Sequence, residues 1–285
     1  MFSRRDIGRL ALAAAPLSRL LAKPDSKVNG VRIGAQSYSF RDRPLDECIK
    51  AMAGIGLSFV ELWSGHIEPG KEAGAEAIKK WRTAPETLAQ MKEVRRKFND
   101  AGIRVYAMNY SFRDQHTDEE IGHGMEMAKV LGTKYITASS KPSLADRINK
   151  LAREHNVTVA MHNHSNLKPD EFARPEDFAA AMEGNTNIAV NLDIGHFIAA
   201  GFDPIDYIEK HHDKIVTLHI KDRKKDQGPN VPFGEGDTPI QEVLQLLKRK
   251  KYAIPAMIEY EYKGADTVAE VRKCYDYCRK ALTTT

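Results

Sequence analysis

The chain has 285 residues, 42% of them hydrophobic and 29% charged, and no run of 18 apolar residues that would form a membrane-spanning helix. Its formal net charge of +4 comes from residues 1–23, which hold five basic residues and one acidic residue, so the rest of the chain has 38 of each sign. This neutral body argues against a nucleic-acid partner, because phosphate binding needs a surplus of Lys and Arg.

The N-terminal segment has the layout of an export signal. Arg4 and Arg5 precede a short apolar stretch at 10–17, and small residues end the segment near Ala22. A charged segment followed by a short apolar one is typical of signal peptides, and paired arginines resemble a twin-arginine signal. We predict that residues 1–23 are a twin-arginine-type signal peptide and that the protein is exported to the periplasm. An amphipathic helix belonging to the fold is the alternative.

From residue 31 onward, apolar β-rich runs alternate with helical stretches. The predicted strands lie at 31–36, 58–63, 103–109, 134–138, 157–162, 188–193, 215–220 and 256–260. The predicted helices lie near 45–55, 85–100, 118–131, 143–155, 175–184, 204–211, 238–250 and 266–281. Such alternation implies parallel strands joined by crossover helices.

Eight such units in about 255 residues match the usual size of one closed barrel. We therefore predict an α/β fold, a single (β/α)8 TIM barrel over residues 24–285. An open doubly wound sheet is the structural alternative. It would normally show a glycine-rich phosphate turn after the first strand, which the sequence IGAQS at 33–37 does not supply.

Polar side chains close most of the predicted strands. In a barrel, the C-terminal ends of the strands form the active face, so these side chains are the candidates for function. The candidates for substrate binding are Gln36, Trp63, Asn109 and His164. The candidates for proton transfer are Glu61, His196, Lys221 and Glu259.

Four strand-end groups point to a metal site. They are His162, Asp193, His219 and Glu259, from the last four predicted strands. Charged or imidazole groups at a buried strand end are costly unless they are paired or bound to metal. Two imidazoles and two carboxylates suit Mn²⁺, Fe²⁺, Co²⁺ or Zn²⁺, so we expect one divalent metal ion here, with positions free for substrate oxygens. A hydrogen-bonded or capping role is the alternative for each group alone.

Several motifs resemble the xylose isomerase-like barrel family, also called sugar phosphate isomerase/epimerase. They are IGAQSYSF at 33–40, FVELW at 59–63, NLDIGH at 191–196, LHIKD at 218–222, VPFGEGD at 231–237 and MIEY at 257–260. The resemblance covers about residues 31–262, nearly the whole body. It implies a barrel enzyme acting on a sugar, and the motifs are shared by family members with different substrates.

The resemblance also implies metal ligands. Family members usually place Glu, Asp, His and Glu on the last four strands, and the last three correspond to Asp193, His219 and Glu259. At the first position this chain has His162, within MHNH at 161–164. By strand alternation His162 and His164 face the same way, and His162 lies deeper in the barrel. We favour His162 as the ligand and leave His164 open as the alternative.

This departure bears on the expected reaction. In family epimerases, two Glu ligands form the acid–base pair, whereas a metal-bound imidazole is a poor base. We expect a metal-dependent isomerase or epimerase acting on a sugar or keto-sugar. The alternatives are a lyase or hydratase acting on keto-sugars or oxidised glycosides, and a non-catalytic sugar-binding barrel. The family's DNA-repair branch is disfavoured, because it needs three zinc ions and a basic face.

Two further features concern the substrate and the assembly. Arg223, Lys224 and Lys225 follow the seventh predicted strand, near the place where many barrels bind phosphate, although a solvated loop is the simpler interpretation. An exported enzyme is expected to meet free or glycosidic sugars rather than phosphorylated ones. The sequence leaves open whether the chain forms a homo-oligomer.

Overall fold

The computed structural model describes residues 23–284. The export signal predicted for residues 1–23 therefore lies outside the described residues, apart from Lys23. The described part of the chain contains no helix that is long and apolar enough to cross a membrane.

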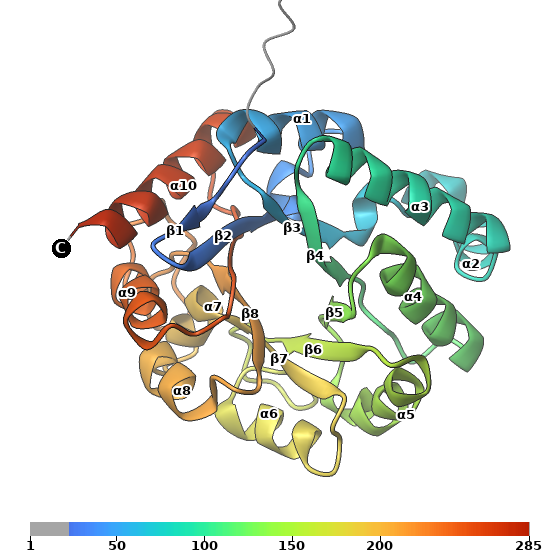
Figure 1. Cartoon of the computed structure of the whole chain (residues 1–285). Coiled ribbons are helices and arrows are strands. Elements are labelled where there is room, and N and C mark those ends of the chain that lie inside the picture. The colour runs from blue at the N-terminus through green and yellow to red at the C-terminus, as the bar shows by residue number, and fades with distance from the viewer. Residues whose placement is uncertain (1–22, 285) are drawn as a thin grey trace, which may run out of the picture.

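Eight parallel strands, joined in sequence order, form a closed barrel because the first of them also pairs with the last (Figure 1). This confirms the predicted (β/α)8 barrel. The barrel strands are β2 (Val31–Gln36), β3 (Phe59–Trp63), β4 (Arg104–Asn109), β5 (Tyr135–Ala138), β6 (Thr158–His162), β7 (Ile188–Asp193), β8 (Ile215–Ile220) and β9 (Ala256–Ile258).

Helices surround the barrel, and eight of them match the predicted positions (Figure 1). They are α1 (Leu45–Ile55), α3 (Pro85–Asp100), α4 (Asp118–Leu131), α5 (Ala145–His155), α6 (Pro175–Met182), α8 (Pro204–His211), α9 (Ile240–Lys250) and α10 (Thr267–Thr283).

Several short elements were not predicted. The strand β1 (Lys27–Val28) forms an antiparallel hairpin with β2, and α2 (Ala75–Trp81) lies in the β3–α3 connection. The helix α7 (Ile194–Ala199) begins at the residue after β7. Four 3-10 turns also occur: η1 (Ser37–Phe40), η2 (Ser64–His66), η3 (Lys71–Ala73) and η4 (Pro142–Leu144).

Local chemistry explains the helix boundaries. Thr117 and Glu120 form a reciprocal capping box at the start of α4, and Gly132 ends the helix with a φ of 88°, where a side chain would be strained. Pro85 and Pro204 occupy the first turns of α3 and α8, where proline costs no hydrogen bond. The fold is thus specified locally as well as by its pattern.

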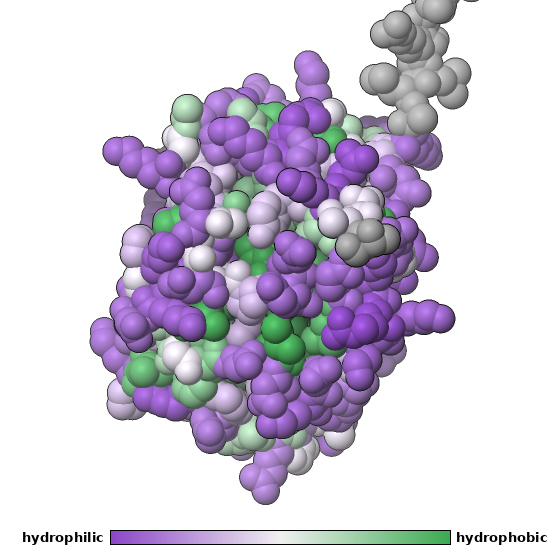
Figure 2. Space-filling view, turned by 90° about the vertical axis from the view of Figure 1, so that its left-hand side faces the viewer, coloured by the Kyte–Doolittle hydropathy of each residue, from purple (hydrophilic) through white to green (hydrophobic). Residues whose placement is uncertain are grey.

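The apolar core lies between the strands and the surrounding helices, and the outer surface is polar. Figure 2 shows the side with α8, α9 and α10, where hydrophilic side chains dominate and apolar residues form small separate areas. Within residues 23–284, Leu167 is the only large hydrophobic side chain classed as exposed. The inside of the barrel, by contrast, holds buried polar groups, including Glu61, Thr137, Asn191 and Thr217. They form the floor on which the site is built.

Candidate metal and substrate site

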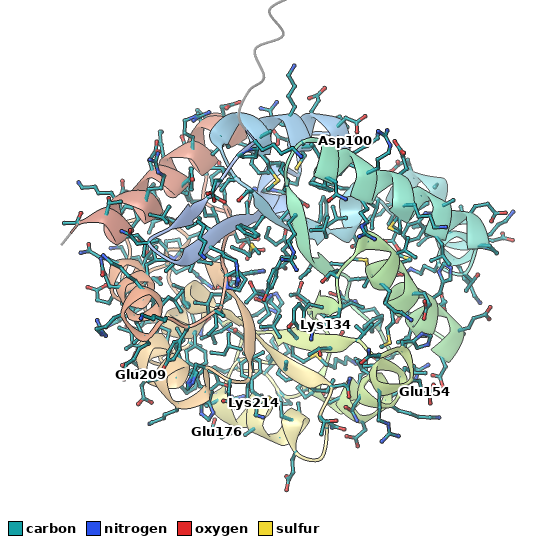
Figure 3. All side chains as sticks on the ribbon, viewed as in Figure 1. Asp100, Lys134, Glu154, Glu176, Glu209 and Lys214 are labelled. Carbon is teal, nitrogen blue, oxygen red and sulfur yellow. The ribbon has the colours of Figure 1, made fainter. Side chains whose placement is uncertain are left out.

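A cavity of about 750 Å³ opens at the C-terminal ends of the barrel strands. This is the end of the barrel opposite Lys134 and Lys214, which are labelled in Figure 3 and precede β5 and β8. Nine of the predicted site residues line the cavity: Gln36, Trp63, Asn109, His162, His164, His196, His219, Lys221 and Glu259. The residues predicted from the strand ends therefore meet at one cavity.

The four predicted metal ligands come together at this cavity: His162, His219 and Glu259 line it, and Asp193 is buried next to them. Ligand atoms of His162, Asp193, His219 and Glu259 all lie within 4.8 Å of one another, and all four residues are buried. The strand register explains the meeting, because Asp193 pairs with His219 and Ile220 pairs with Ile258, so that Glu259 directly follows β9. The backbone N–H of Glu259 still donates to the carbonyl of Ile220.

Asp193 is fixed by the junction of β7 and α7. Its Oδ1 accepts the backbone N–H of His196 at 2.7 Å and so caps α7. Its backbone N–H donates to Oδ1 of Asn163, whose Nδ2 donates back to the carbonyl of Asp193. The second oxygen, Oδ2, is buried and accepts no hydrogen bond within the described part of the chain, and its near neighbour is the ammonium of Lys221, 3.1 Å away in an ion pair. Burial raises the pKa of Asp193 to about 6.

His219 lies between two carboxylates. Its Nδ1 is 3.0 Å from Oε2 of Glu259, and its Nε2 is 2.9 Å from Oε1 of Glu61. Burial opposes the charged imidazole, but these two carboxylates hold the pKa of His219 well above its usual value. For His162, burial and the neighbouring His219 hold the pKa well below that value.

Lys221 is buried among carboxylates. Its Nζ lies 2.8 Å from Glu259, 3.1 Å from Asp193 and 2.6 Å from Glu261. Burial opposes the charge, but the three carboxylates raise the pKa of Lys221 above its usual range. Burial alone would raise the pKa of Glu259, but the positive charges of Lys221 and His219 outweigh burial and hold that pKa well below its usual range. Lys221 is therefore a permanent cation beside the predicted ligands.

The residues present fit a divalent metal. Four carboxylates, those of Glu61, Asp193, Glu259 and Glu261, surround one ammonium and one imidazole, so negative charge exceeds the permanent positive charge. Oδ2 of Asp193 accepts no hydrogen bond and has only the ion pair with Lys221, so it keeps a lone pair for a metal. Mixed nitrogen and oxygen donors suit a first-row transition metal or zinc.

His164 and His196 belong to a second group that also includes His162. In His196, Nε2 lies 3.0 Å from Nζ of Lys221 and Nδ1 lies 2.7 Å from a guanidinium nitrogen of Arg223. Both nitrogens of His196 thus already face cations. The imidazole of His164 packs edge-on against His162, with ring centroids 4.9 Å apart. The choice of His162 over His164 as ligand stays a prediction.

Two expectations from the sequence change. Glu61, expected to transfer protons, is fully buried and does not line the cavity; it contacts His219 from below. The alternation of side chains along β3 correctly predicts that Glu61 points into the barrel. Glu61 lies two residues before the end of β3, however, and is therefore too deep to line the cavity. Arg223, considered for phosphate binding, is engaged by the carbonyl of Gly228 and by Ser165 and His196.

Several residues of the cavity were not among the predicted site residues. Tyr38, Arg113, Lys141, Glu171 and Glu261 also line the cavity. Glu261 was visible as a second acid two residues after Glu259, and Tyr38 as the residue following Ser37 at the end of the first strand. Glu171 lies in the long β6–α6 connection, where no sequence pattern indicates which way a side chain points.

Comparisons with known proteins agree with this geometry. The chain is 34% identical over 266 residues to L-ribulose-5-phosphate 3-epimerase UlaE of Shigella flexneri, covering 86% of each protein. This relative bears out the expected class of enzyme, an isomerase or epimerase.

Two solved structures share the fold. The apo form of 3-keto-D-glucoside 4-epimerase YcjR from E. coli matches with a TM-score of 0.67 and 13% identity, over 88% of this chain and 99% of that one. The IOLI protein, solved with a bound zinc atom, matches with a TM-score of 0.63 and 17% identity, over 88% of this chain and 95% of that one.

A family model agrees with both the motifs and the barrel. The model described as "Xylose isomerase-like TIM barrel" matches residues 49–280, which include all four predicted metal ligands. Together with the similarity to the epimerase of Shigella flexneri, this match shows that the chain belongs to the xylose isomerase-like TIM barrel family.

Proposed function

We propose that this protein is a metal-dependent sugar isomerase or epimerase. The observation that carries the proposal is the set of His162, Asp193, His219 and Glu259, gathered at the base of a cavity large enough for a sugar. A divalent metal held there would polarise the carbonyl and hydroxyl oxygens of the substrate and so acidify the adjacent C–H group. The named epimerase relative supports this reaction class.

Glu259 is the residue that we assign to proton transfer. It lines the cavity, whereas Asp193 does not, so its carboxylate is both a ligand candidate and accessible to a substrate. Lys221, 2.8 Å away, holds this carboxylate ionised and hence ready to accept a proton. The same ammonium can donate a hydrogen bond to an oxygen on which negative charge develops.

A second proton-transfer group is needed for epimerisation, because the proton must return on the other face of the substrate. The family's usual second Glu is replaced here by His162. Glu171 and His164 line the cavity and lie in or beside the β6–α6 connection, on the side of His162. We assign the second role to this side, with His196 on the adjoining β7–α7 junction as the other candidate.

The remaining predicted residues fit substrate binding. Gln36, Trp63 and Asn109 line the cavity from the ends of β2, β3 and β4, strands that carry none of the four predicted metal ligands. Trp63 and Tyr38 form an edge-to-face pair with centroids 5.0 Å apart. An aromatic wall with amide groups nearby suits a sugar, which has both apolar and hydroxyl faces.

We propose further that the sugar carries no phosphate. Each cation that lines the cavity already has a partner: Arg113 donates to the carbonyl of Ser139, Lys141 pairs with Asp114, and Lys221 pairs with carboxylates. Export to the periplasm, proposed from the sequence of residues 1–23, supports the same choice. The named relative's substrate is phosphorylated, so phosphorylated sugars belong in the test.

Elimination or hydration at a keto-sugar is the second candidate function. The observation that favours it is the replacement of the second Glu by His162, because a lyase needs only one basic group next to the acidified C–H. Oxidised glycosides are the substrates to which this reaction would apply.

The test is solvent deuterium exchange into free sugars, keto-sugars, glycosides and sugar phosphates, using protein loaded with one metal at a time. We expect exchange at one carbon with the wild type and at least a hundredfold slower exchange with Glu259→Gln, in line with the usual ~10²–10⁴-fold contribution of a positioned base. Exchange with accumulation of an eliminated product would indicate the lyase. Binding without exchange for any sugar would show a non-catalytic barrel and overturn the proposal.

A further inference from the structure

The floor of the site contains a polar layer that touches the two histidine ligand candidates from below. Glu61 on β3 and Asn191 on β7 are both completely buried, and neither lines the cavity. Glu61 lies 2.9 Å from Nε2 of His219, and Nδ2 of Asn191 lies 3.1 Å from that same nitrogen and 3.5 Å from Nδ1 of His162. Neither residue can touch a substrate, yet each contacts an imidazole expected to bind metal.

The two nitrogens of His219 face different partners. Nδ1 lies toward the ligand set, 3.0 Å from Glu259 and 4.0 Å from Asp193. Nε2 lies on the opposite side, against the carboxylate of Glu61, which also accepts the hydroxyl of Thr137 at 2.7 Å. A carboxylate can only accept, so Glu61 favours a proton on Nε2, just as Glu259 favours one on Nδ1 in the metal-free protein. Because Glu259 is itself a predicted ligand and Glu61 is not, a metal would displace the proton on Nδ1 and leave the one on Nε2.

The side-chain amide of Asn191 must be oriented to match this tautomer of His219. A protonated Nε2 of His219 cannot face the Nδ2 donor of Asn191, but it can face the amide oxygen if the amide is turned by half a rotation. Oδ1 of Asn191 is buried and has no hydrogen-bond partner within residues 23–284, so the end of the amide that faces away is unpaired in either orientation. The imidazoles therefore decide which end faces them.

With the amide oxygen facing the rings, Nδ1 of His162 gains an acceptor and carries the proton. Its other nitrogen, Nε2, is then the free one. We infer that Glu61 and Asn191 are positioning residues that fix both histidines for metal binding, His219 through Nδ1 and His162 through Nε2. This inference rests on the metal site of the proposed function and adds the two residues that orient it. Metal-bound histidines elsewhere commonly donate their second N–H to such acceptors.

The first test reads the tautomers directly. Wild-type protein labelled with ¹⁵N-histidine and loaded with Zn²⁺ should show a metal-bound Nδ1 and a protonated Nε2 in His219, and the reverse in His162, in long-range ¹H–¹⁵N spectra. The signals are assigned by their loss in single-histidine variants. A protonated Nδ1 in His219, or a protonated Nε2 in His162, would overturn the inference.

The second test uses variants that distinguish an acceptor from a donor at position 191. Asn191→Asp keeps the acceptor and replaces the donor with a second acceptor, whereas Asn191→Leu removes both. We expect Zn²⁺ affinity, measured by chelator competition, to fall by ~10–100-fold in Asn191→Leu and Glu61→Leu but not in Asn191→Asp. Equal losses in Asn191→Asp and Asn191→Leu would show that the amide acts as a donor and overturn the inference.

A merely structural role is excluded by a matched control. Thr217 lies on β8, two residues before His219, and its fully buried hydroxyl donates to the carbonyl of Pro255. The substitution Thr217→Val removes this hydroxyl. It should leave Zn²⁺ affinity unchanged even if unfolding of the metal-free protein shifts. A loss as large as that of Glu61→Leu would mean that any floor substitution disturbs the site.

The tests also separate this inference from the proposed function. A wild type that takes up no Zn²⁺ would sink the metal site and this inference together. Zn²⁺ affinity that depends on Asp193 and Glu259 but not on Glu61 or Asn191 would sink this inference alone.

Discussion

The ammonium nitrogen of Lys221 lies 2.8 Å from Oε2 of Glu259, and the same nitrogen lies 3.1 Å from Oδ2 of Asp193. One buried lysine thus contacts both carboxylates expected to bind metal. Breaking a buried ion pair by removing one partner leaves the other charge uncompensated in a medium of low dielectric constant. Lys221 and a bound metal ion would therefore both neutralise these carboxylates, so the loss of one should make the protein depend more on the other.

Replacing Lys221 by Met should destabilise the metal-free protein strongly and the metal-loaded protein less. Loss of one partner of a buried pair typically costs about 3–5 kcal/mol. We expect Lys221→Met to show a larger rise in Tm on adding Zn²⁺ than the wild type, measured by calorimetry with and without chelator. Lys141→Met is the control, because Lys141 forms an exposed pair with Asp114 and should change Tm little. An unchanged Tm of metal-free Lys221→Met would contradict the prediction.

Metal uptake should weaken in acid. Burial raises the pKa of Asp193 to about 6, and that of His219 is also raised because Glu61 and Glu259 outweigh burial. Both groups must be free of protons to bind metal, so protons compete increasingly as the pH falls through about 6. Each displaced proton should lower the apparent affinity about tenfold per pH unit. Chelator competition from about pH 5 to pH 8 checks this, and a flat profile would refute it.

Asp193→Asn provides the matched comparison for that experiment. It removes the carboxylate that titrates near 6. Its affinity should be lower at every pH, and its profile should show one fewer competing proton.

Gly195→Ala should disturb both stability and metal binding. A Cβ atom at Gly195 would lie 2.7 Å from the carbonyl oxygen of Lys221, so α7 would have to move away from β8. Overpacking of this kind typically costs about 1–3 kcal/mol, and the movement would also displace the cap that Asp193 provides. Denaturant unfolding and Zn²⁺ titration measure the two effects.

The control for this substitution is Gly54→Ala. Gly54 lies in α1, and a Cβ atom there would meet nothing within 4 Å. Alanine is the better helix former by roughly 0.5–1 kcal/mol, so Gly54→Ala should be neutral or stabilising. If both variants behave alike, close packing of α7 against β8 is not what requires Gly195.

Trp63→Ala should raise KM without affecting metal content. Trp63 lines the cavity from the end of β3, and the predicted ligands all come from β6 to β9. Losing an aromatic contact worth about 0.5–1.5 kcal/mol corresponds to roughly a threefold to tenfold rise in KM. Steady-state kinetics on the substrate found by deuterium exchange would check this, together with metal analysis. A fall in kcat with unchanged KM would place Trp63 in the reaction rather than in binding.

Much of the fold could be predicted because a strand followed by a helix recurs eight times along the chain. The short elements could not. The helix α7 begins at Ile194, with no connecting residue after β7, so the strand pattern runs directly into it. The strand β1 is different, because its hairpin with β2 turns at Asn29 and Gly30, both with positive φ, and an Asn-Gly pair is a hairpin signal that was overlooked in the sequence.

The candidate site could be predicted to the extent that it lies at strand ends. His162, Asp193, His219 and Glu259 were identified because each is the last, or nearly the last, residue of its predicted strand. Depth inside the barrel is a different matter, since alternation reveals which way a side chain points but not how high it lies. This is why Glu61 was assigned to the cavity and why the position of Asn191 between two imidazoles went unnoticed.

The four metal-ligand candidates come from four consecutive strands, β6 to β9, and their geometry depends on only three strand registers. The opposite wall, at the ends of β2 to β5, contributes side chains to the cavity but none to that set. If the proposed function holds, one half of the barrel would carry the chemistry and the other half would select the substrate. Glu61, reaching from β3 to His219, and Ser39, hydrogen-bonded to Ile258 and Tyr260 on either side of Glu259, are contacts through which a change in the second half would be felt at the predicted ligands.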